Sequence, residues 1–276
     1  MKIFDCFPFL DELDVLDLRL QELDPVVDRF VLLEATYTHT GQPKPLYYQE
    51  NAARFAAFHD KIIHVLLDDI GPELDGRTRI RSNEIYHRQS LVRGLDDAAP
   101  SDLVIIADVD EIPSRKAIQT VRDSERLRHR AVQFRQRLHY YYLDCVSYQT
   151  LSYHPVIAPA HLVNLCGAQA IRGLPWETMT AITDAGWHFS YFGGVKAIQQ
   201  KMMAYADVES NVAPFNQESH IDYNMRAGMD PIGRDIPCGW IPFDESFPET
   251  VKANVEKYVE MGWFRHPPVQ NSGQSA

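Results

Sequence analysis

The chain has 276 residues, of which 45% are hydrophobic, and its formal net charge at pH 7 is −11. A chain of this length and apolar content can bury a substantial core, as one domain or as two small ones. The acidic balance excludes a broad basic face that would neutralise a nucleic-acid backbone, so no nucleic-acid partner is expected.

The cysteines and the start of the chain indicate the cellular compartment in which the protein is expected, and the end of the chain indicates a tail. The four cysteines are scattered without a CxxC pair, which argues against a zinc ribbon or a dense disulfide framework. We expect them to be small core residues in a reducing compartment. The start, "MKIFDCFPF", enters a strand pattern without a signal peptide or membrane anchor, so no membrane span and a cytoplasmic location are expected. Residues 1–266 are predicted to form one domain and residues 267–276, "PPVQNSGQSA", a disordered tail.

The first half of the chain alternates short apolar runs with helical patterns. Strands are predicted at residues 3–7, 30–33, 62–67 and 103–107. One helix presents a leucine face, Leu13, Leu16, Leu20 and Leu23, and a polar helix is expected at about 79–98. This alternation predicts an α/β fold with a mostly parallel central sheet flanked by helices. The 103–107 run is apolar throughout, as in a central strand covered on both faces.

The second half has a different texture. Residues 131–143, "AVQFRQRLHYYYL", alternate like a strand that is half exposed on one face. Residues 194–210 and 249–264 have the pattern of amphipathic helices. We expect this half to supply the acceptor side and the closing helices of the same fold.

The stretch "SDLVIIADVDEIPS", residues 101–114, runs from a strand into three carboxylates. In open α/β sheets ligands bind beyond the carboxyl ends of the strands, where Asp108, Asp110 and Glu111 would lie. Two carboxylates about 4 Å apart repel by roughly 4 kcal/mol at an effective dielectric near 20. A divalent cation, Mg²⁺ or Mn²⁺, would relieve that repulsion and bind a diphosphate. Pro113 is expected to help end the strand.

Other interpretations of this stretch remain open. A calcium loop of the EF-hand type needs glycine at its sixth position, which Pro113 occupies here. A haloacid-dehalogenase-like phosphatase would use Asp108 as its nucleophile, although such a motif normally lies near the start of its domain. The stretch is also compatible with a solvated acidic loop that ends in Ser114 as the cap of a following helix.

Four stretches together resemble glycosyltransferase family 17, which contains the β-1,4-mannosyl-glycoprotein 4-β-N-acetylglucosaminyltransferases. They are "IFDCFPFLDELDVLDLRLQEL", "VDRFVLLEATYTHTGQPKPLYYQENAARF", "VIIADVDEIPS" and "AGWHFSYFGG", in the same order and over roughly residues 2–264. The resemblance implies a GT-A-like fold with a DxD motif at the end of a central strand. It also implies a divalent metal and an inverting transfer from a UDP-sugar, most simply GlcNAc from UDP-GlcNAc, to a glycan acceptor.

Within this resemblance, three residues are the expected metal ligands: Asp108, Asp110 and His188. Asp108 could instead reach the donor ribose. Glu111 would lie beside them and orient the site. His188 in "GWHFS" is the third ligand because a neutral imidazole suits Mn²⁺, although a core histidine bonded to backbone is the competing interpretation.

Residues for donor binding and proton transfer are expected elsewhere. Arginines form forks that suit a diphosphate, and helical residues seven apart share a face. The candidate donor-binding residues are Glu34, Lys44, Arg54, Arg81, Asn83 and Arg88. Either Glu177 or Asp184 is expected to be the carboxylate base, since both precede the His188 segment. Trp176 and Trp187 could stack on a sugar face or belong to the core. A non-catalytic carbohydrate-binding module is the remaining alternative.

Overall fold

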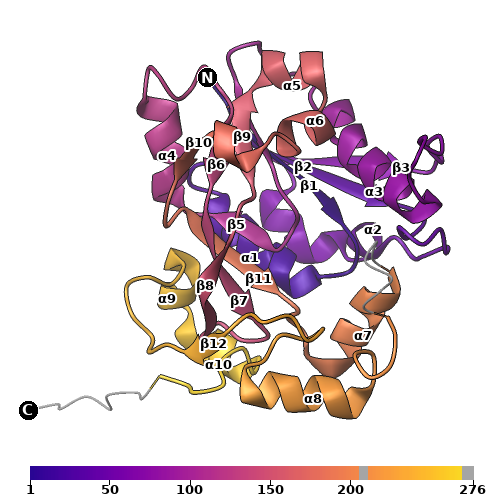
Figure 1. The fold of residues 1–276 in the computed structure, drawn as a ribbon. Helices are drawn as coiled ribbons and strands as arrows, with labels where there is room; N and C mark the ends of the chain where they lie inside the picture. Colours follow the sequence, from indigo (N-terminus) through magenta and orange to yellow (C-terminus); the bar gives the residue numbers. More distant parts are fainter. Residues whose placement is uncertain (205–210, 269–276) are drawn as a thin grey trace, which may run out of the picture.

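The computed structural model describes residues 1–204 and 211–268, apart from the side chains of residues 149 and 150. In these residues the chain forms two β-sheets with helices packed around them (Figure 1). The principal sheet has seven strands, in the order β10 (Thr180–Ile182), β6 (Val132–Phe134), β9 (Val156–Pro159), β4 (Leu103–Ile106), β1 (Ile3–Phe9), β2 (Arg29–Ala35) and β3 (Ile62–Leu67).

The principal sheet is mixed but mainly parallel. Strand β1 pairs in parallel with both β2 and β4, and β2–β3 and β10–β6 are also parallel. Strand β9 is antiparallel to its neighbours β4 and β6. The predicted α/β class and the four strands predicted in the first half of the chain are therefore confirmed, with shifts of up to two residues at their ends.

A second sheet was not anticipated from the sequence. Its five strands follow the order β12 (Cys238–Trp240), β8 (Cys145–Ser152), β7 (Gln136–Tyr140), β11 (Gly186–Ser190) and β5 (Glu111–Pro113). The prediction of one half-exposed strand over residues 131–143 is wrong. Those residues are divided between β6 and β7, in different sheets, and both strands are largely buried because each sheet is covered by other elements.

The leucine-faced helix agrees with its prediction, whereas the predictions for 79–98 and 249–264 differ from the helices that the structure shows, and the prediction for 194–210 is tested only as far as residue 204. The bounds of the helices are α1 (Leu13–Leu23), α2 (Tyr47–Glu50), η1 (Ala52–Phe58), α3 (Arg79–Gln89), η2 (Ser90–Gly94), α4 (Arg115–Asp123), α5 (Ala160–Cys166), α6 (Ala168–Arg172), η3 (Trp176–Thr178), α7 (Gly194–Ala204), α8 (Glu218–Ala227), α9 (Glu249–Ala253) and α10 (Val255–Glu260). The helix expected at 79–98 tightens into the 3₁₀ segment η2. The helix expected at 249–264 breaks at Asn254, and residues 205–210 of the one expected at 194–210 lie outside the described residues.

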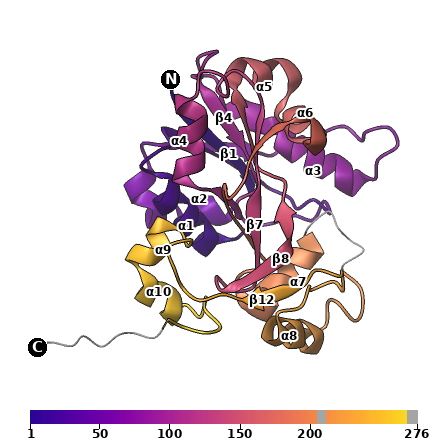
Figure 2. The ribbon, with the colours of Figure 1, turned by 60° about the vertical axis from the view of Figure 1, so that its left-hand side comes forward.

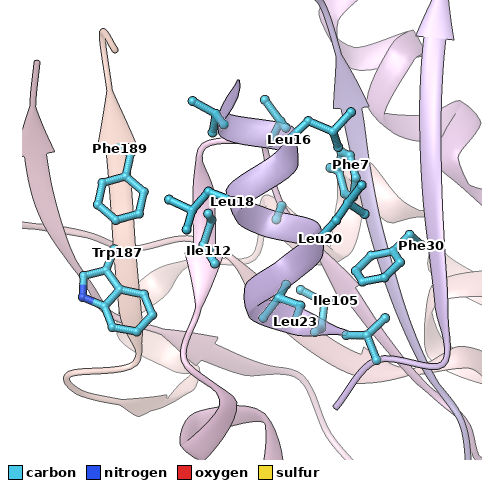
Figure 3. Packing of buried hydrophobic residues seen from close by; sticks show 14 of the residues in the cluster. Phe7, Leu16, Leu18, Leu20, Leu23, Phe30, Ile105, Ile112, Trp187 and Phe189 are labelled. Carbon is cyan, nitrogen blue, oxygen red and sulfur yellow. The ribbon is translucent and has the colours of Figure 1, made fainter. Parts of the chain in front are cut away.

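Helix α1 is packed between the two sheets, which explains why it is apolar beyond one face. Figure 3 shows its leucines reaching residues of both sheets: Phe7, Phe30 and Ile105 of the principal sheet, and Ile112, Trp187 and Phe189 of the second. Burying each leucine fully contributes about 1.5–3 kcal/mol relative to an exposed position. The helix thereby fixes the carboxyl ends of β1 and β4 relative to the second sheet.

The other face of the principal sheet is covered by α3, α5 and α6, opposite α1, α2 and α4 (Figure 2). Val104 and Ile106 face this layer, whereas Leu103 and Ile105 face α1, so β4 is covered on both faces as predicted. The expectation of core cysteines holds for Cys6 and Cys145, while Cys238 is half-buried and Cys166 is exposed on short helix α5.

Two further expectations concern segments rather than the core. No helix within residues 1–204 and 211–268 is both long and apolar enough to cross a bilayer. The predicted tail, residues 267–276, lies outside the described part of the chain from residue 269 onwards.

Candidate active site

A cavity of about 670 Å³ opens beyond the carboxyl ends of β1, β2 and β4. Residues that follow β1 and β2, such as Leu10 and His39, line one part of it. The end of β8 and the segment from α6 to η3 line another part. Asp108 and Asp110, from the loop that follows β4, also border the cavity. The acidic loop therefore lies where ligands bind in open α/β sheets.

The acidic loop turns sharply and returns as a strand. Strand β4 ends at Ile106, the chain turns at Val109 and Asp110, and Glu111–Pro113 forms β5, antiparallel to β11. The sequence had suggested that Pro113 helps to end β4, but Pro113 lies within β5. Because β5 is an edge strand of the second sheet, its proline interrupts no interior ladder. Ser114 accepts a hydrogen bond from the backbone N–H of Ala117 and caps α4, as one interpretation expected.

A fully buried arginine holds the backbone of this loop. Arg19 of α1 donates through Nε and Nη2 to both oxygens of Asp5, at 2.7 and 2.6 Å. Its Nη1 donates to the carbonyl oxygens of Asp108, Val109 and Glu111 at 3.0, 3.1 and 2.8 Å. Since Arg19 and Asp5 are both 0% exposed, the pair is compensated by contacts instead of by water. One guanidinium thus ties α1 and β1 to the turn that carries the carboxylates.

Asp108 and Glu111 share Arg172, and Asp108 also contacts Arg88. Arg172 at the end of α6 donates to Asp108 Oδ2 at 2.9 Å and to both oxygens of Glu111, while Arg88 of α3 donates to Asp108 Oδ1 at 3.0 Å. Burial alone would raise the pKa of Asp108, but Arg172 and Arg88 outweigh it and hold that pKa well below its usual value. Glu111 also accepts from the backbone N–H of Asp108 at 2.8 Å. Glu111 is 2% exposed, and its carboxylate holds the loop in place through its contacts with Arg172 and the Asp108 N–H.

Asp110 faces different partners. Its Oδ2 accepts from Lys201 Nζ of α7 at 2.7 Å, and its Oδ1 lies 3.6 Å from Nε2 of His188. His188 alternates along β11 with the core residues Trp187 and Phe189, so its ring points to the opposite side, toward the cavity. Burial alone would lower the pKa of His188, but the Asp110 carboxylate outweighs it and raises that pKa.

Asp108, Asp110 and His188, the three expected metal ligands, do not face one another as a set, because Asp108 contacts arginines while Asp110 lies beside His188. The described residues contain no group of three or more His, Cys, Asp or Glu side chains arranged to hold a metal ion. Arg88 and Arg172 take up Asp108, which leaves Asp110 and His188 side by side. Nε2 of His188 is the ring nitrogen that faces Asp110, so an ion held by both residues would bind at that nitrogen. Two protein ligands fit Mg²⁺ or Mn²⁺, which take most of their shell from water and phosphate.

The predicted donor-binding residues divide into two groups. Lys44, Arg88 and Asp108 line the cavity, together with the predicted metal ligands Asp110 and His188. The others are absent from the described lining residues. Glu34 accepts from the N–H groups of Tyr48 and Gln49, and Arg54 pairs with Asp14. Arg81 and Asn83 contact residues that do line the cavity: Arg81 pairs with Glu84, and Asn83 donates to the His39 carbonyl.

The candidate bases and tryptophans also differ in placement. Glu177 is exposed on η3, directly after Trp176, which lines the cavity. Asp184 is 76% exposed and lies 3.3 Å from Arg137, away from the described lining residues. Trp187 is 8% exposed and donates to the Ser246 carbonyl at 2.9 Å, so the suggestion that it stacks on a sugar is wrong. Its ring belongs to the core around α1.

Three basic residues of the site escaped the sequence-based reasoning. Arg172 lies on a five-residue helix with no motif, and Lys201 resembles any polar position of an amphipathic helix. Arg19 lies among the leucines of α1, where only the proximity of Asp5 in the folded chain explains a buried charge. Each contact joins residues from 14 to 91 positions apart, so no local pattern contains it.

These features define an α/β protein whose acidic loop and basic side chains border one cavity. The chain belongs to glycosyltransferase family 17, whose model matches residues 1–237. It is 36% identical over 121 residues to a rat β-1,4-mannosyl-glycoprotein 4-β-N-acetylglucosaminyltransferase, covering 42% of this chain and 22% of that one. The human enzyme of the same name is 36% identical over 111 residues, covering 39% and 21%. The chain thus matches about a fifth of the length of these curated relatives.

Solved structures give a weaker likeness. Glucosyl-3-phosphoglycerate synthase from Mycobacterium tuberculosis, in complex with Mn²⁺, UDP and phosphoglyceric acid, has a TM-score of 0.38 at 13% identity, with 91% of both chains covered. A 2-C-methyl-D-erythritol 4-phosphate cytidylyltransferase from Francisella tularensis has a TM-score of 0.34 at 14% identity, covering 66% of this chain and 90% of that one. Because both TM-scores are below 0.5, neither likeness defines a shared fold.

Proposed function

We propose that this protein is an inverting, metal-dependent glycosyltransferase of GT-A-like architecture. It transfers a sugar, most simply GlcNAc from UDP-GlcNAc, to a hydroxyl of a glycan. Membership of family 17 supports glycosyl transfer, and the names of the relatives support N-acetylglucosamine as the sugar. Since the chain belongs to this family, the phosphatase and the non-catalytic module are not retained.

The observation that carries the proposal is the balance of charges around the acidic loop. Asp108 and Asp110 border the cavity together with Arg88, Arg172 and Lys201. A donor diphosphate brings negative charge, which these three cationic side chains can share as the bond to the sugar breaks. Arginine forks are suited to phosphate oxygens, and a lysine adds a compact point charge.

Asp110 and His188 would hold the divalent ion. When bound, it would supply positive charge to the diphosphate and so favour departure of the nucleotide. The protein's own part is to keep both ligands in place: the N–H of Phe189 donates to the Asp110 carbonyl at 2.8 Å, and β11 pairs with β5 at His188 and Glu111. The acceptor hydroxyl then attacks the anomeric carbon from the opposite side, and a carboxylate takes its proton. Glu177 is the proposed base, because it adjoins the cavity residue Trp176.

Thermal unfolding with a panel of nucleotide sugars, with and without Mn²⁺, tests this proposal. A ligand at 100 times its Kd stabilises the folded chain by about 2.7 kcal/mol. For a chain of this size that corresponds to a rise in Tm of roughly 5–10 °C. We expect UDP-sugars to give this rise and to require Mn²⁺ for most of it. Equal, negligible shifts for every nucleotide in both conditions would remove the proposal's support.

A further inference from the structure

Two exposed aromatic rings lie at the cavity but take no part in the charged cluster. Tyr153 is 38% exposed and Trp176 is 44% exposed, and both line the cavity. Their rings are stacked, with centroids 4.8 Å apart and planes inclined by 27°. The structure describes all four tryptophans of the chain, and Trp176 alone among them is exposed. Leu151 and Leu174, which are 37% and 38% exposed, line the same cavity, and exposed apolar side chains gathered in this way mark a binding site more than a single exposed ring would.

The aromatic pair is held in a defined place relative to the acidic loop. Trp176 follows Arg172 by four residues, and Arg172 binds both Asp108 and Glu111. Four residues span at most about 14 Å even when fully extended. Gly173, Leu174 and Pro175, which connect the two, also line the cavity. The surface between the carboxylates and the aromatic pair is therefore continuous.

The pair lies on a different part of the cavity wall from the ends of β1 and β2. Its residues follow β8 and α6, whereas the ends of β1 and β2 line the cavity with Leu10 and His39. The guanidinium carbon of Arg135 lies 5.6 Å from the centroid of the Tyr153 ring and braces that ring. Trp176 projects from η3 with close to half of its surface in water, so its ring can be covered by a ligand.

The chemistry of an exposed indole selects the ligand. A pyranose ring has an apolar face of C–H groups and a rim of hydroxyls, so it covers an aromatic ring with its face while its hydroxyls stay in water. No charged group is needed for this contact, so it suits a neutral glycan.

We propose that Trp176, supported by Tyr153, is the platform on which one pyranose ring of the acceptor glycan stacks. The proposal rests on the function proposed above, because it assigns this part of the cavity wall to the acceptor. Trp176 is a binding residue that sets acceptor affinity. Tyr153 is a positioning residue that fixes the tilt of the indole.

Direct binding tests the platform independently of turnover. The probe is a trimannosyl N-glycan core oligosaccharide, chosen because the relatives' names specify mannosyl glycoproteins. The variants are Trp176→Ala, Trp176→Phe and Tyr153→Ala. The matched control is Tyr223→Ala, which removes another tyrosine that is 63% exposed, on α8 and outside the described cavity lining. Calorimetric titration with the glycan and, separately, with UDP in the presence of Mn²⁺ gives the two affinities.

The expected result is a loss of glycan affinity of at least tenfold in Trp176→Ala, a smaller loss in Tyr153→Ala and near-normal affinity in Trp176→Phe and Tyr223→Ala. UDP affinity should stay within twofold in all four. The platform is refuted if the parent protein does not bind the glycan at millimolar concentration or if Trp176→Ala binds it equally well. It is also refuted if Trp176→Ala loses UDP instead. A parent protein that binds the glycan but no UDP-sugar would refute the transferase proposal and leave the platform standing.

Discussion

Replacing Arg19 with methionine should both destabilise the fold and loosen the acidic loop. Asp5 would be left charged and fully buried without its partner, and three carbonyls of the loop would lose the hydrogen bond from Arg19. Breaking a buried ion pair from one side costs about 3–5 kcal/mol. A domain has about 5–15 kcal/mol of stability, so Arg19→Met should still fold, with a Tm lower by on the order of 10 °C.

The double variant Asp5→Leu with Arg19→Met separates the two roles of the arginine. It removes the orphaned carboxylate, so its loss of stability should be at least about 2 kcal/mol smaller than the sum of the two single losses. The loop carbonyls of Asp108 and Glu111 still lack the hydrogen bonds from Arg19, so UDP affinity should stay at least tenfold below that of the parent protein. Urea unfolding measures the stability, and calorimetric titration with UDP measures the affinity.

Two results would refute this reasoning. A loss of less than about 1 kcal/mol of unfolding free energy in Arg19→Met would mean that the fold does not depend on the buried Arg19–Asp5 pair. Full UDP affinity in the stabilised double variant would mean that the carbonyl contacts of Arg19 do not shape the loop. Leu18→Ala is the control, because it destabilises α1 by a comparable 2–5 kcal/mol, on the order expected for a buried leucine, without touching the loop contacts.

Three further predictions concern single residues. Asp110→Asn and His188→Ala should each abolish the Mn²⁺-dependent part of the Tm rise with UDP, with the fold retained by circular dichroism; an unchanged rise in both would remove the metal assignment. Glu177→Gln should lower kcat at least 100-fold with little change in UDP affinity, whereas the matched Asp184→Asn should stay within threefold; the reverse ranking would make Asp184 the base. Burial lowers the pKa of His139 to about 3. Between about pH 6.5 and pH 3, His139 is therefore protonated in the unfolded chain but not in the folded chain, and the free energy of unfolding falls as pH falls. His139→Phe should reduce the loss of unfolding free energy between pH 7 and pH 5 by about 2 kcal/mol in urea titrations, and an identical loss in both proteins would contradict this.

Much of the principal sheet could be predicted because its signals are local. Residues 62–67 form β3 as predicted, and the apolar run before Asp108 became β4, buried on both faces. The second sheet could not be predicted, because β5 has only three residues and exists by pairing with β11, which lies some 70 positions later. Short strands of this kind have no periodicity of their own to recognise.

The acidic residues of the candidate site could be predicted from the sequence, but most of its arginine and lysine residues could not. The position of Asp108 and Asp110 at a strand end follows from one continuous motif. Their partners lie on two later helices: Arg172 of α6 pairs with Asp108, and Lys201 of α7 pairs with Asp110. Only the folded chain shows that the two aspartates have different basic partners. Arg88 was predicted from a seven-residue spacing, and Glu84 does bridge it to Arg81, but Arg88 alone of the two arginines lines the cavity.

A transfer assay measures the proposed reaction itself. The protein is incubated with UDP-GlcNAc, Mn²⁺ and the trimannosyl glycan, and mass spectrometry follows the glycan while UDP release is measured in parallel. We expect one N-acetylhexosamine to be added per glycan in step with UDP release, and we expect Asp110→Asn to reduce both at least 100-fold. Product formation that is undiminished in Asp110→Asn, or no transfer from any UDP-sugar to any glycan of an N-glycan panel, would contradict the proposed function.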